Sequence, residues 1–175
     1  PRAYVEVAGQ LALATPPTTG YRLPTEAEWE WTARHTGGGG SRRYPWGDAM
    51  PPPAGAGNFA DRTAQGIVSN VLADYSDGHA VTAPVGSFSA SPLGLFDLGG
   101  NAAEWASDRY TVYPSGVPLA VDPTGPADGQ YHVIRGSSWR HSGISELRLS
   151  FRDFGDSGRL DVGFRIARTA DDQER

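Results

Sequence analysis

The chain has 175 residues, enough for one domain with a hydrophobic core, and its 23 Gly, 14 Pro and 18 aromatic residues predict a compact, loop-rich globule. A formal net charge of −5 disfavours nucleic acid as a partner, and no apolar run approaches the ~20 residues of a membrane span. Cys and Lys are both absent, which excludes disulfides, thiolate metal sites, Cys nucleophiles and Lys Schiff bases. Because the chain begins at Pro1 without Met, its compartment is left open between the cytoplasm and the periplasm of a bacterium.

The first predicted elements are a short strand and a helix. Apolar residues alternate over residues 11–15, a pattern that favours a strand. The helix is expected to begin after Thr25, because Thr25 and Glu28 have the spacing of a capping box. Four consecutive glycines, residues 37–40, end the helix and are interpreted as a loop.

Three strands are predicted in the last third of the chain, at residues 131–136, 147–152 and 162–167. The last two are expected to pair and to bury their alternating apolar residues, which are Leu147, Leu149, Phe151, Val162, Phe164 and Ile166.

Four arginines lie in or beside these strands, where Arg is rarely buried without a partner. They are Arg135, Arg148, Arg152 and Arg165. We expect them to form a lattice of ion pairs with nearby carboxylates, and an anion-binding groove is the alternative. The candidate partners are Asp108, Asp153, Asp156 and Asp161.

The most informative stretch lies at residues 94–105. Asp97 and Glu104 flank a Gly-Gly-Asn turn, whose glycines permit backbone angles that bring carbonyls toward one point. Together with the carbonyls of Gly100 and Ala102, the two carboxylates would form an all-oxygen ligand set, which suits Ca²⁺. The alternative is a tight turn in which Asp97 is the turn former and Glu104 is solvated.

Four ordered motifs resemble those of the formylglycine-generating enzyme (sulfatase-modifying factor) family. They are YRLPTEAEWE at residues 21–30, YPWG at 44–47, the stretch at 94–105, and RGSSW at 135–139 with GFR at 163–165. The resemblance implies an α+β, C-type-lectin-like fold with bound calcium, in one domain over residues 1–175. In that family further strands precede the first motif, so we expect a partial domain, completed by a missing N-terminal segment or a partner chain.

The resemblance also implies a second calcium site. Its ligands would be the side chains of Asn58 and Asp77 and the backbone carbonyls of Phe59 and His79. On the residues alone, the Asp77-Gly78 pair is typical of an ordinary turn.

Two family activities can be weighed against the residues present. Formylglycine synthesis in this family uses copper(I) held by two Cys between the last two motifs, and residues 140–148 contain no sulfur, so we predict no copper and no such activity. A second branch uses non-haem iron, which needs two His and a carboxylate. The four His residues include no pair at helical ligand spacing, which disfavours iron in this chain.

These observations lead us to predict a calcium-stabilised, non-catalytic recognition or scaffolding domain that binds a protein or small-molecule ligand. The predicted contact residues are Trp139, Arg140, His141 and Phe154. For Trp139 the alternative is burial for packing, and for His141 we expect a loop position rather than a place in a catalytic triad. The alternative function is a non-haem iron oxygenase or a divergent modifying enzyme whose active site needs residues outside this chain.

Overall fold

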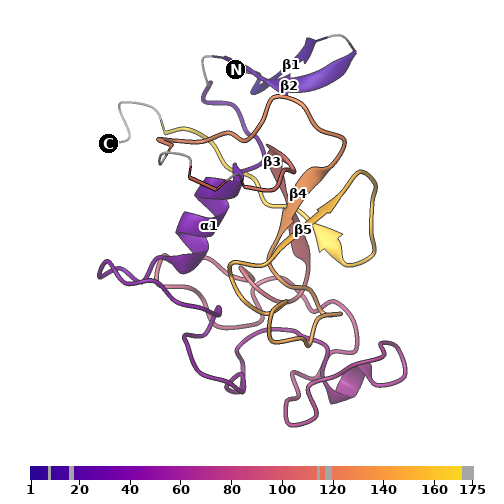
Figure 1. Ribbon diagram of the computed structural model, residues 1–175. Coiled ribbons are helices and arrows are strands. Elements are labelled where there is room, and N and C mark those ends of the chain that lie inside the picture. Colours follow the sequence, from indigo (N-terminus) through magenta and orange to yellow (C-terminus); the bar gives the residue numbers. More distant parts are fainter. Residues whose placement is uncertain (8, 16–17, 114, 117–119, 171–175) are drawn as a thin grey trace.

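The computed structural model describes the chain from residue 1 to residue 170, except for residues 8, 16–17, 114 and 117–119. Figure 1 shows a small central sheet with one helix beside it and long loops around both. The regular elements are few and short, which confirms the expected loop-rich α+β class. In the described part of the chain, no helix is long and apolar enough to cross a bilayer.

The chain begins with an antiparallel hairpin of β1 (Tyr4–Val7) and β2 (Gln10–Leu13). The strand expected at residues 11–15 overlaps β2, but the sequence pattern did not predict β1. Most residues of β1 are exposed, so this strand lacks the one-sided apolar pattern from which strands are predicted.

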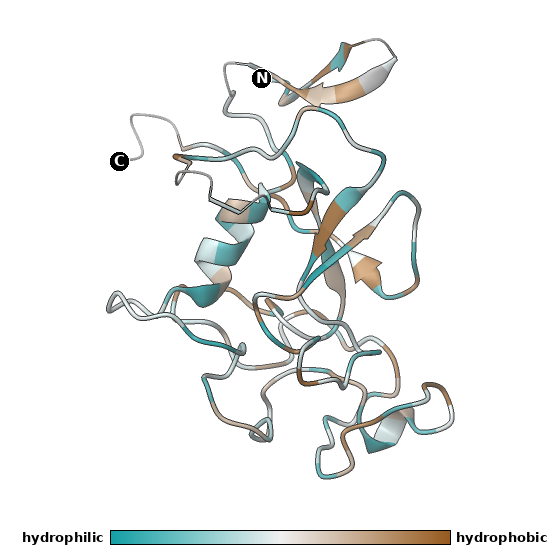
Figure 2. Cartoon of the chain, in the orientation of Figure 1, coloured by the Kyte–Doolittle hydropathy of each residue, from teal (hydrophilic) through white to brown (hydrophobic). Residues whose placement is uncertain are grey.

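Helix α1 (Glu26–Arg34) confirms the predicted capping box. The Thr25 hydroxyl accepts a hydrogen bond from the Glu28 N–H at 3.1 Å, and the Glu28 carboxylate accepts one from the Thr25 N–H at 2.8 Å. The buried face of α1 carries Glu26, Trp29 and Ala33, so a carboxylate faces the sheet together with apolar groups. Figure 2 shows this mixed character, with α1 largely hydrophilic to neutral and hydrophobic residues on β4.

The central sheet has four strands in the order β5-β4-β3-β6. Their bounds are Ala103–Arg109 for β3, His132–Arg135 for β4, Arg152–Gly155 for β5 and Val162–Gly163 for β6. β4 pairs antiparallel with both β3 and β5, and β6 pairs parallel with β3. One further turn of 3-10 helix, η1 (Arg62–Ala64), lies in the loops that precede the sheet.

The prediction of strands at residues 147–152 and 162–167 was largely wrong. Residues 147–150 form turns and a bend, β5 begins only at Arg152, and β5 pairs with β4 rather than with β6. Leu147 and Leu149 are buried as expected, but they reach the core from turns. Phe164 and Ile166 are 69% and 61% exposed, so alternation there does not reflect burial on one face of a sheet.

Besides buried residues of β3 and β4, such as Val133 and Ile134, the core contains two clusters built around the loops. One contains Trp29, Ala33, Leu98 and Leu149, and the other contains Tyr44, Phe59, Tyr75 and Leu147. Because Trp29, Tyr44 and Leu98 come from three different motif segments, the two clusters pack these segments against the loops around them.

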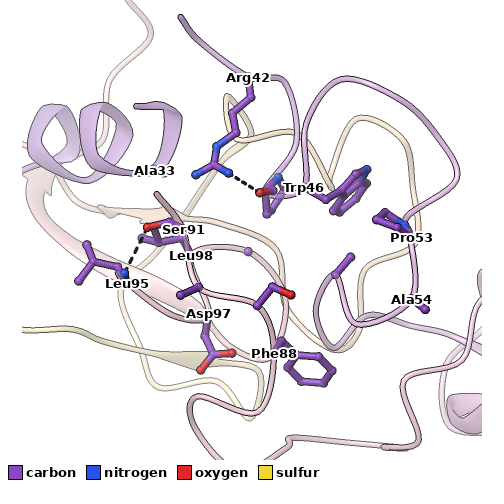
Figure 3. Close-up of a pocket in the computed structure, with 15 residues that line it drawn as sticks. Ala33, Arg42, Trp46, Pro53, Ala54, Phe88, Ser91, Leu95, Asp97 and Leu98 are labelled. Carbon is purple, nitrogen blue, oxygen red and sulfur yellow. Dashed lines mark hydrogen bonds between the residues drawn. The ribbon is translucent and has the colours of Figure 1, made fainter. Parts of the chain in front are cut away.

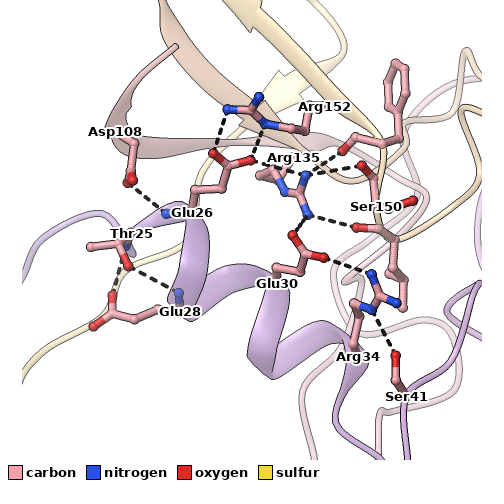
Figure 4. A network of polar contacts seen from close by, with 12 residues as sticks. Thr25, Glu26, Glu28, Glu30, Arg34, Ser41, Asp108, Arg135, Ser150 and Arg152 are labelled. Atoms are coloured by element: carbon pink, nitrogen blue, oxygen red, sulfur yellow. Dashed lines mark hydrogen bonds and ion pairs between the residues drawn. The ribbon is translucent and has the colours of Figure 1, made fainter. Parts of the chain in front are cut away.

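The predicted arginine lattice is present, but most of its partners are glutamates (Figure 4). Arg135 pairs with Glu26 and Glu30, and Arg152 also pairs with Glu26. Asp108 accepts instead from the Glu26 N–H at 2.7 Å, and burial raises the pKa of its carboxyl. Sequence spacing could not show that Glu26 and Glu30, one helical turn apart, point at the sheet.

Arg165 and Arg159 form the other strong pairs near the sheet. Arg165 pairs with Glu104, and Arg159 pairs with Asp153 and Asp161. Arg148, the fourth predicted member of the lattice, is exposed.

Candidate functional site

The Gly-Gly-Asn turn is the junction where three loops meet. The Asn101 N–H donates to the Asn58 carbonyl at 2.7 Å, and the Asn101 carbonyl accepts from the Trp139 N–H at 3.0 Å. The Asn101 side chain accepts from the Ala83 N–H at 2.8 Å. Gly100 has φ +87°, and a Cβ there would lie 2.7 Å from the Asn58 carbonyl oxygen, so only glycine fits. Ala102 follows as a half-buried residue before β3.

Glu104 is a buried ion-pair partner in this structure, which contradicts the alternative that it is solvated. Its carboxylate accepts from the Trp29 indole N–H at 2.7 Å and from the Arg165 Nε–H at 2.6 Å. The Asp97 carboxylate accepts from the Gly86 N–H at 2.7 Å. As arranged, Glu104 does not fit a calcium ion because a guanidinium already neutralises it. Calcium at this turn therefore stays a prediction that requires Arg165 to release Glu104.

The residues of the second predicted calcium site lie together. The Asp77 carboxylate accepts from the N–H groups of Phe59 and His79, both at 2.9 Å, and the His79 carbonyl accepts from the Thr63 hydroxyl at 2.7 Å. Asn58 is fully buried next to Phe59, and its Oδ1 has no hydrogen-bond partner among the described residues. Buried oxygens normally accept a hydrogen bond. A hard cation, which binds oxygen ligands, would give this oxygen the partner it lacks.

Electrostatics also favour a cation at this second site. Burial raises the pKa of Asp77, and the negative charge of Asp61 adds to the shift. Asp61 itself accepts from the Asp77 N–H, and sequence reasoning missed it although Asp61-x-Thr63 is a capping pattern. No three His, Cys, Asp or Glu side chains converge as a metal site in the described part, so an ion would also need carbonyl oxygens.

The segment after β4 does not form a nucleophilic triad. Ser138 is fully buried, its hydroxyl donates to Asp161 at 3.2 Å, and its N–H donates to His141 Nδ1 at 2.9 Å. His141 packs edge-on against Phe151 with ring centroids 5.7 Å apart. Trp139 is buried, as its alternative interpretation predicted, and Arg140 lies over its ring at 5.6 Å.

An open hollow of about 560 Å³, which we call the Arg140 hollow, lies beside this segment. Its lining residues are Arg140, His141, Gly158, Arg159, Leu160 and Asp161. Arg140 is exposed and forms no ion pair with a described residue, and Leu160 is 89% exposed. Sequence reasoning named Asp161 only as a candidate partner of the arginines and missed Leu160, for which the only signal was an apolar residue inside a polar loop.

Phe154 is not part of this hollow. It packs against Tyr110 and Tyr131, with ring centroids 4.5 and 5.1 Å apart. Of the predicted contact residues, Arg140 and His141 therefore line the hollow, whereas Phe154 lies elsewhere.

Burial lowers the pKa of His141, which predicts a pH-dependent stability. Protonation would also break the bond that Nδ1 accepts from the Ser138 N–H. Below the ordinary His pKa of about 6.5 the unfolded chain binds more protons than the folded one, so this contribution is complete above that pH and decreases below it. We expect His141→Asn to flatten the fall in unfolding free energy between about pH 7.5 and 5.5, measured by urea titration. An unchanged slope in the variant would contradict this assignment.

Comparison with known proteins places this geometry in a family. The sequence pattern of the family described as sulfatase-modifying factor enzyme 1-like domain matches residues 2–170. The chain belongs to this family. The chain is 39% identical over 171 residues to a formylglycine-generating enzyme of Streptomyces coelicolor, covering 95% of this chain and 52% of that protein.

Other members with different names are also similar. The domain is 33% identical over 165 residues to a hercynine oxygenase of Mycolicibacterium thermoresistibile, covering 88% of this chain and 33% of that protein. Among solved structures, Treponema denticola variable protein 1 matches with a TM-score of 0.72 and 25% identity, over 93% of this chain and 60% of that one. PvdO from Pseudomonas aeruginosa matches with a TM-score of 0.62 and 30% identity, over 86% and 53%.

These matches confirm the resemblance and the C-type-lectin-like fold class. The chain spans about half the length of the Streptomyces relative, at 52% of that protein.

Proposed function

We propose that this sulfatase-modifying factor domain is a calcium-stabilised recognition or scaffolding domain that binds a protein or small-molecule ligand at the Arg140 hollow. The observation that carries the proposal is the chemistry of this hollow, where an exposed Arg and an exposed Leu lie between the last two family motifs. Arg is over-represented among residues that dominate binding energy. The chain has no Cys, so it cannot itself supply thiolates for copper(I) at this position.

The architecture of the hollow supports binding over catalysis. Arg159 is held by Asp153 at 2.6 Å and by Asp161 at 3.0 Å, so its guanidinium forms a fixed wall. Arg140 lies over the buried Trp139 ring, which positions its cation without neutralising it. The Ser138 hydroxyl is buried beneath them and is not available to a substrate.

Calcium is proposed at the site of Asn58, Phe59, Asp77 and His79. When bound, the ion would supply positive charge to the unpartnered Asn58 Oδ1 and to the half-buried Asp77 carboxylate. Its role would be structural, since the Asn58 backbone carbonyl also accepts a hydrogen bond from the Asn101 N–H and thereby links this site to the central turn. Binding to the folded state alone would raise stability by mass action.

A second candidate function rests on the similarity to hercynine oxygenase. In that case the domain would belong to an iron-dependent oxygenase or a divergent modifying enzyme. Its active site would need residues from outside these 175, because the described part contains no cluster of three metal-ligating side chains. Stoichiometric iron in the purified protein would favour this second function.

The recognition proposal predicts a loss of binding without a loss of fold. Arg140→Ala combined with Leu160→Ser should reduce capture of co-purifying proteins or metabolites about tenfold, while the melting temperature stays within a few degrees. Quantitative mass spectrometry of the captured material measures the first effect and thermal unfolding the second. Arg148→Ala, an exposed Arg outside the hollow, is the matched control. Retained capture by the double variant, or equal loss in the control, would contradict the proposal.

A further inference from the structure

A separate and smaller pocket of about 270 Å³ lies beside the aromatic turn that follows α1 (Figure 3). It is bounded by the end of α1, by residues 42–56 and by residues 88–99. The lining residues that matter for its chemistry are Arg42, Trp46, Phe88, Leu95 and Asp97. None of them lines the Arg140 hollow.

Arg42 is a partly buried cation without a counter-ion. One of its amino groups donates to the Pro45 carbonyl at 2.8 Å, whereas its buried Nε has no hydrogen-bond partner. No carboxylate among the described residues forms an ion pair with it, in contrast to the buried Arg135. Burial lowers the pKa of Arg42, because desolvation disfavours the charged form. An anion in the pocket would supply the counter-charge that the Arg42 guanidinium lacks and offset this cost.

The remaining lining residues narrow the class of anion. The Asp97 carboxylate also lines the pocket, and only one of its oxygens is held, by the Gly86 N–H. The Asp97 carboxylate would repel a doubly charged phosphate more strongly than a singly charged carboxylate, and one negative charge matches the single guanidinium. Trp46, Phe88 and Leu95 supply apolar walls, which favour a ligand with an apolar body.

We propose that this pocket binds a small monocarboxylate with an aromatic or aliphatic body, its carboxylate on Arg42 and its body between Trp46 and Phe88. The site is independent of the Arg140 hollow and of both predicted calcium sites except for the shared Asp97. The pocket volume suits a single-ring acid rather than a folded partner.

Titration with phenylacetate tests the proposal, with phenylacetamide and phenyl phosphate as matched probes. We expect phenylacetate to bind about tenfold more tightly than the neutral amide, as a charge-assisted hydrogen bond implies, and more tightly than the phosphate. Chemical-shift changes on titration would report the affinities. The wild-type domain and each variant are first checked for native folding by circular dichroism.

Three variants locate the site. Arg42→Gln should weaken phenylacetate binding about tenfold, and Ala90→Trp, at an exposed lining position, should abolish it by filling the pocket. Arg43→Gln removes the neighbouring exposed charge outside the lining and should leave binding unchanged. If Arg42→Gln does not fold, phenylacetate binding by Ala90→Trp alone tests whether the ligand occupies this pocket. No phenylacetate binding, equal binding of the amide, tighter binding of the phosphate or unimpaired binding by Ala90→Trp would each overturn the proposal.

Discussion

Replacing Arg135 by Gln is expected to lower the unfolding free energy by about 3–5 kcal/mol, the range found when one partner of a buried ion pair is removed. Arg135 is fully buried, and its guanidinium pairs with Glu30 at 2.8 Å and Glu26 at 3.3 Å. It also donates to the Leu149 carbonyl at 2.9 Å and lies over the Trp29 ring at 5.2 Å. One substitution thus removes the only fully buried cation of the lattice, leaves Glu26 with Arg152 and Glu30 with Arg34 as their remaining partners, and frees the turn that carries Leu149.

The matched control is Arg34→Gln, because Arg34 pairs with the same Glu30 at 2.9 Å but on the half-exposed side of α1. Exposed pairs at this helical spacing contribute about 0.5 kcal/mol or less. Urea titrations of both variants under the same conditions would measure the difference. Equal effects for Arg135 and Arg34 would show that the lattice does not hold α1 on the sheet.

Glu104→Gln is expected to cost about 2–4 kcal/mol, since it removes the charge that neutralises Arg165 and weakens the acceptor of the Trp29 indole N–H. The contacts that would be lost connect three segments, because Glu104 lies on β3, Trp29 on α1 and Arg165 in the last family motif. A double-mutant cycle with Arg165→Gln should show strong coupling between the two side chains.

The same variant distinguishes an ion pair from a calcium ligand. If Arg165 is the partner of Glu104, the loss in Glu104→Gln should be equal with calcium and with chelator. If calcium takes that position, chelator treatment of the parent protein should reproduce most of the loss, and the cycle with Arg165→Gln should show little coupling. Thermal unfolding in both buffers separates these outcomes.

Local signals in the sequence predicted local structure well. The capping box at Thr25 and Glu28 fixes where α1 begins, because both of its hydrogen bonds lie within four residues. The alternation at residues 147–152 led to a wrong strand prediction because burial there depends on contacts between residues far apart in the sequence. Leu147 and Leu149 are buried because separate loops meet there, as the Leu149 N–H bond to the Arg43 carbonyl shows, and no period in the sequence encodes such a contact.

The family resemblance predicted which residues would lie together at the second calcium site, but it did not predict the ion pairs around the candidate site. Asn58, Phe59, Asp77 and His79 lie together as the family resemblance implied. The Arg165 partner of Glu104 and the unpaired state of Arg42 depend on long-range packing across more than 50 residues of sequence. For this reason the Arg42 pocket could be recognised only in the folded structure.

The most direct test of a calcium-stabilised domain without a redox metal is elemental analysis of the purified protein, combined with its melting temperature. Protein purified in calcium without chelator should carry about one equivalent of calcium at the Asn58 site, with no stoichiometric copper or iron. Chelator should lower the melting temperature of the parent protein and leave that of Asn58→Ala unchanged. Stoichiometric iron or copper, or a melting temperature indifferent to chelator, would contradict the proposed function.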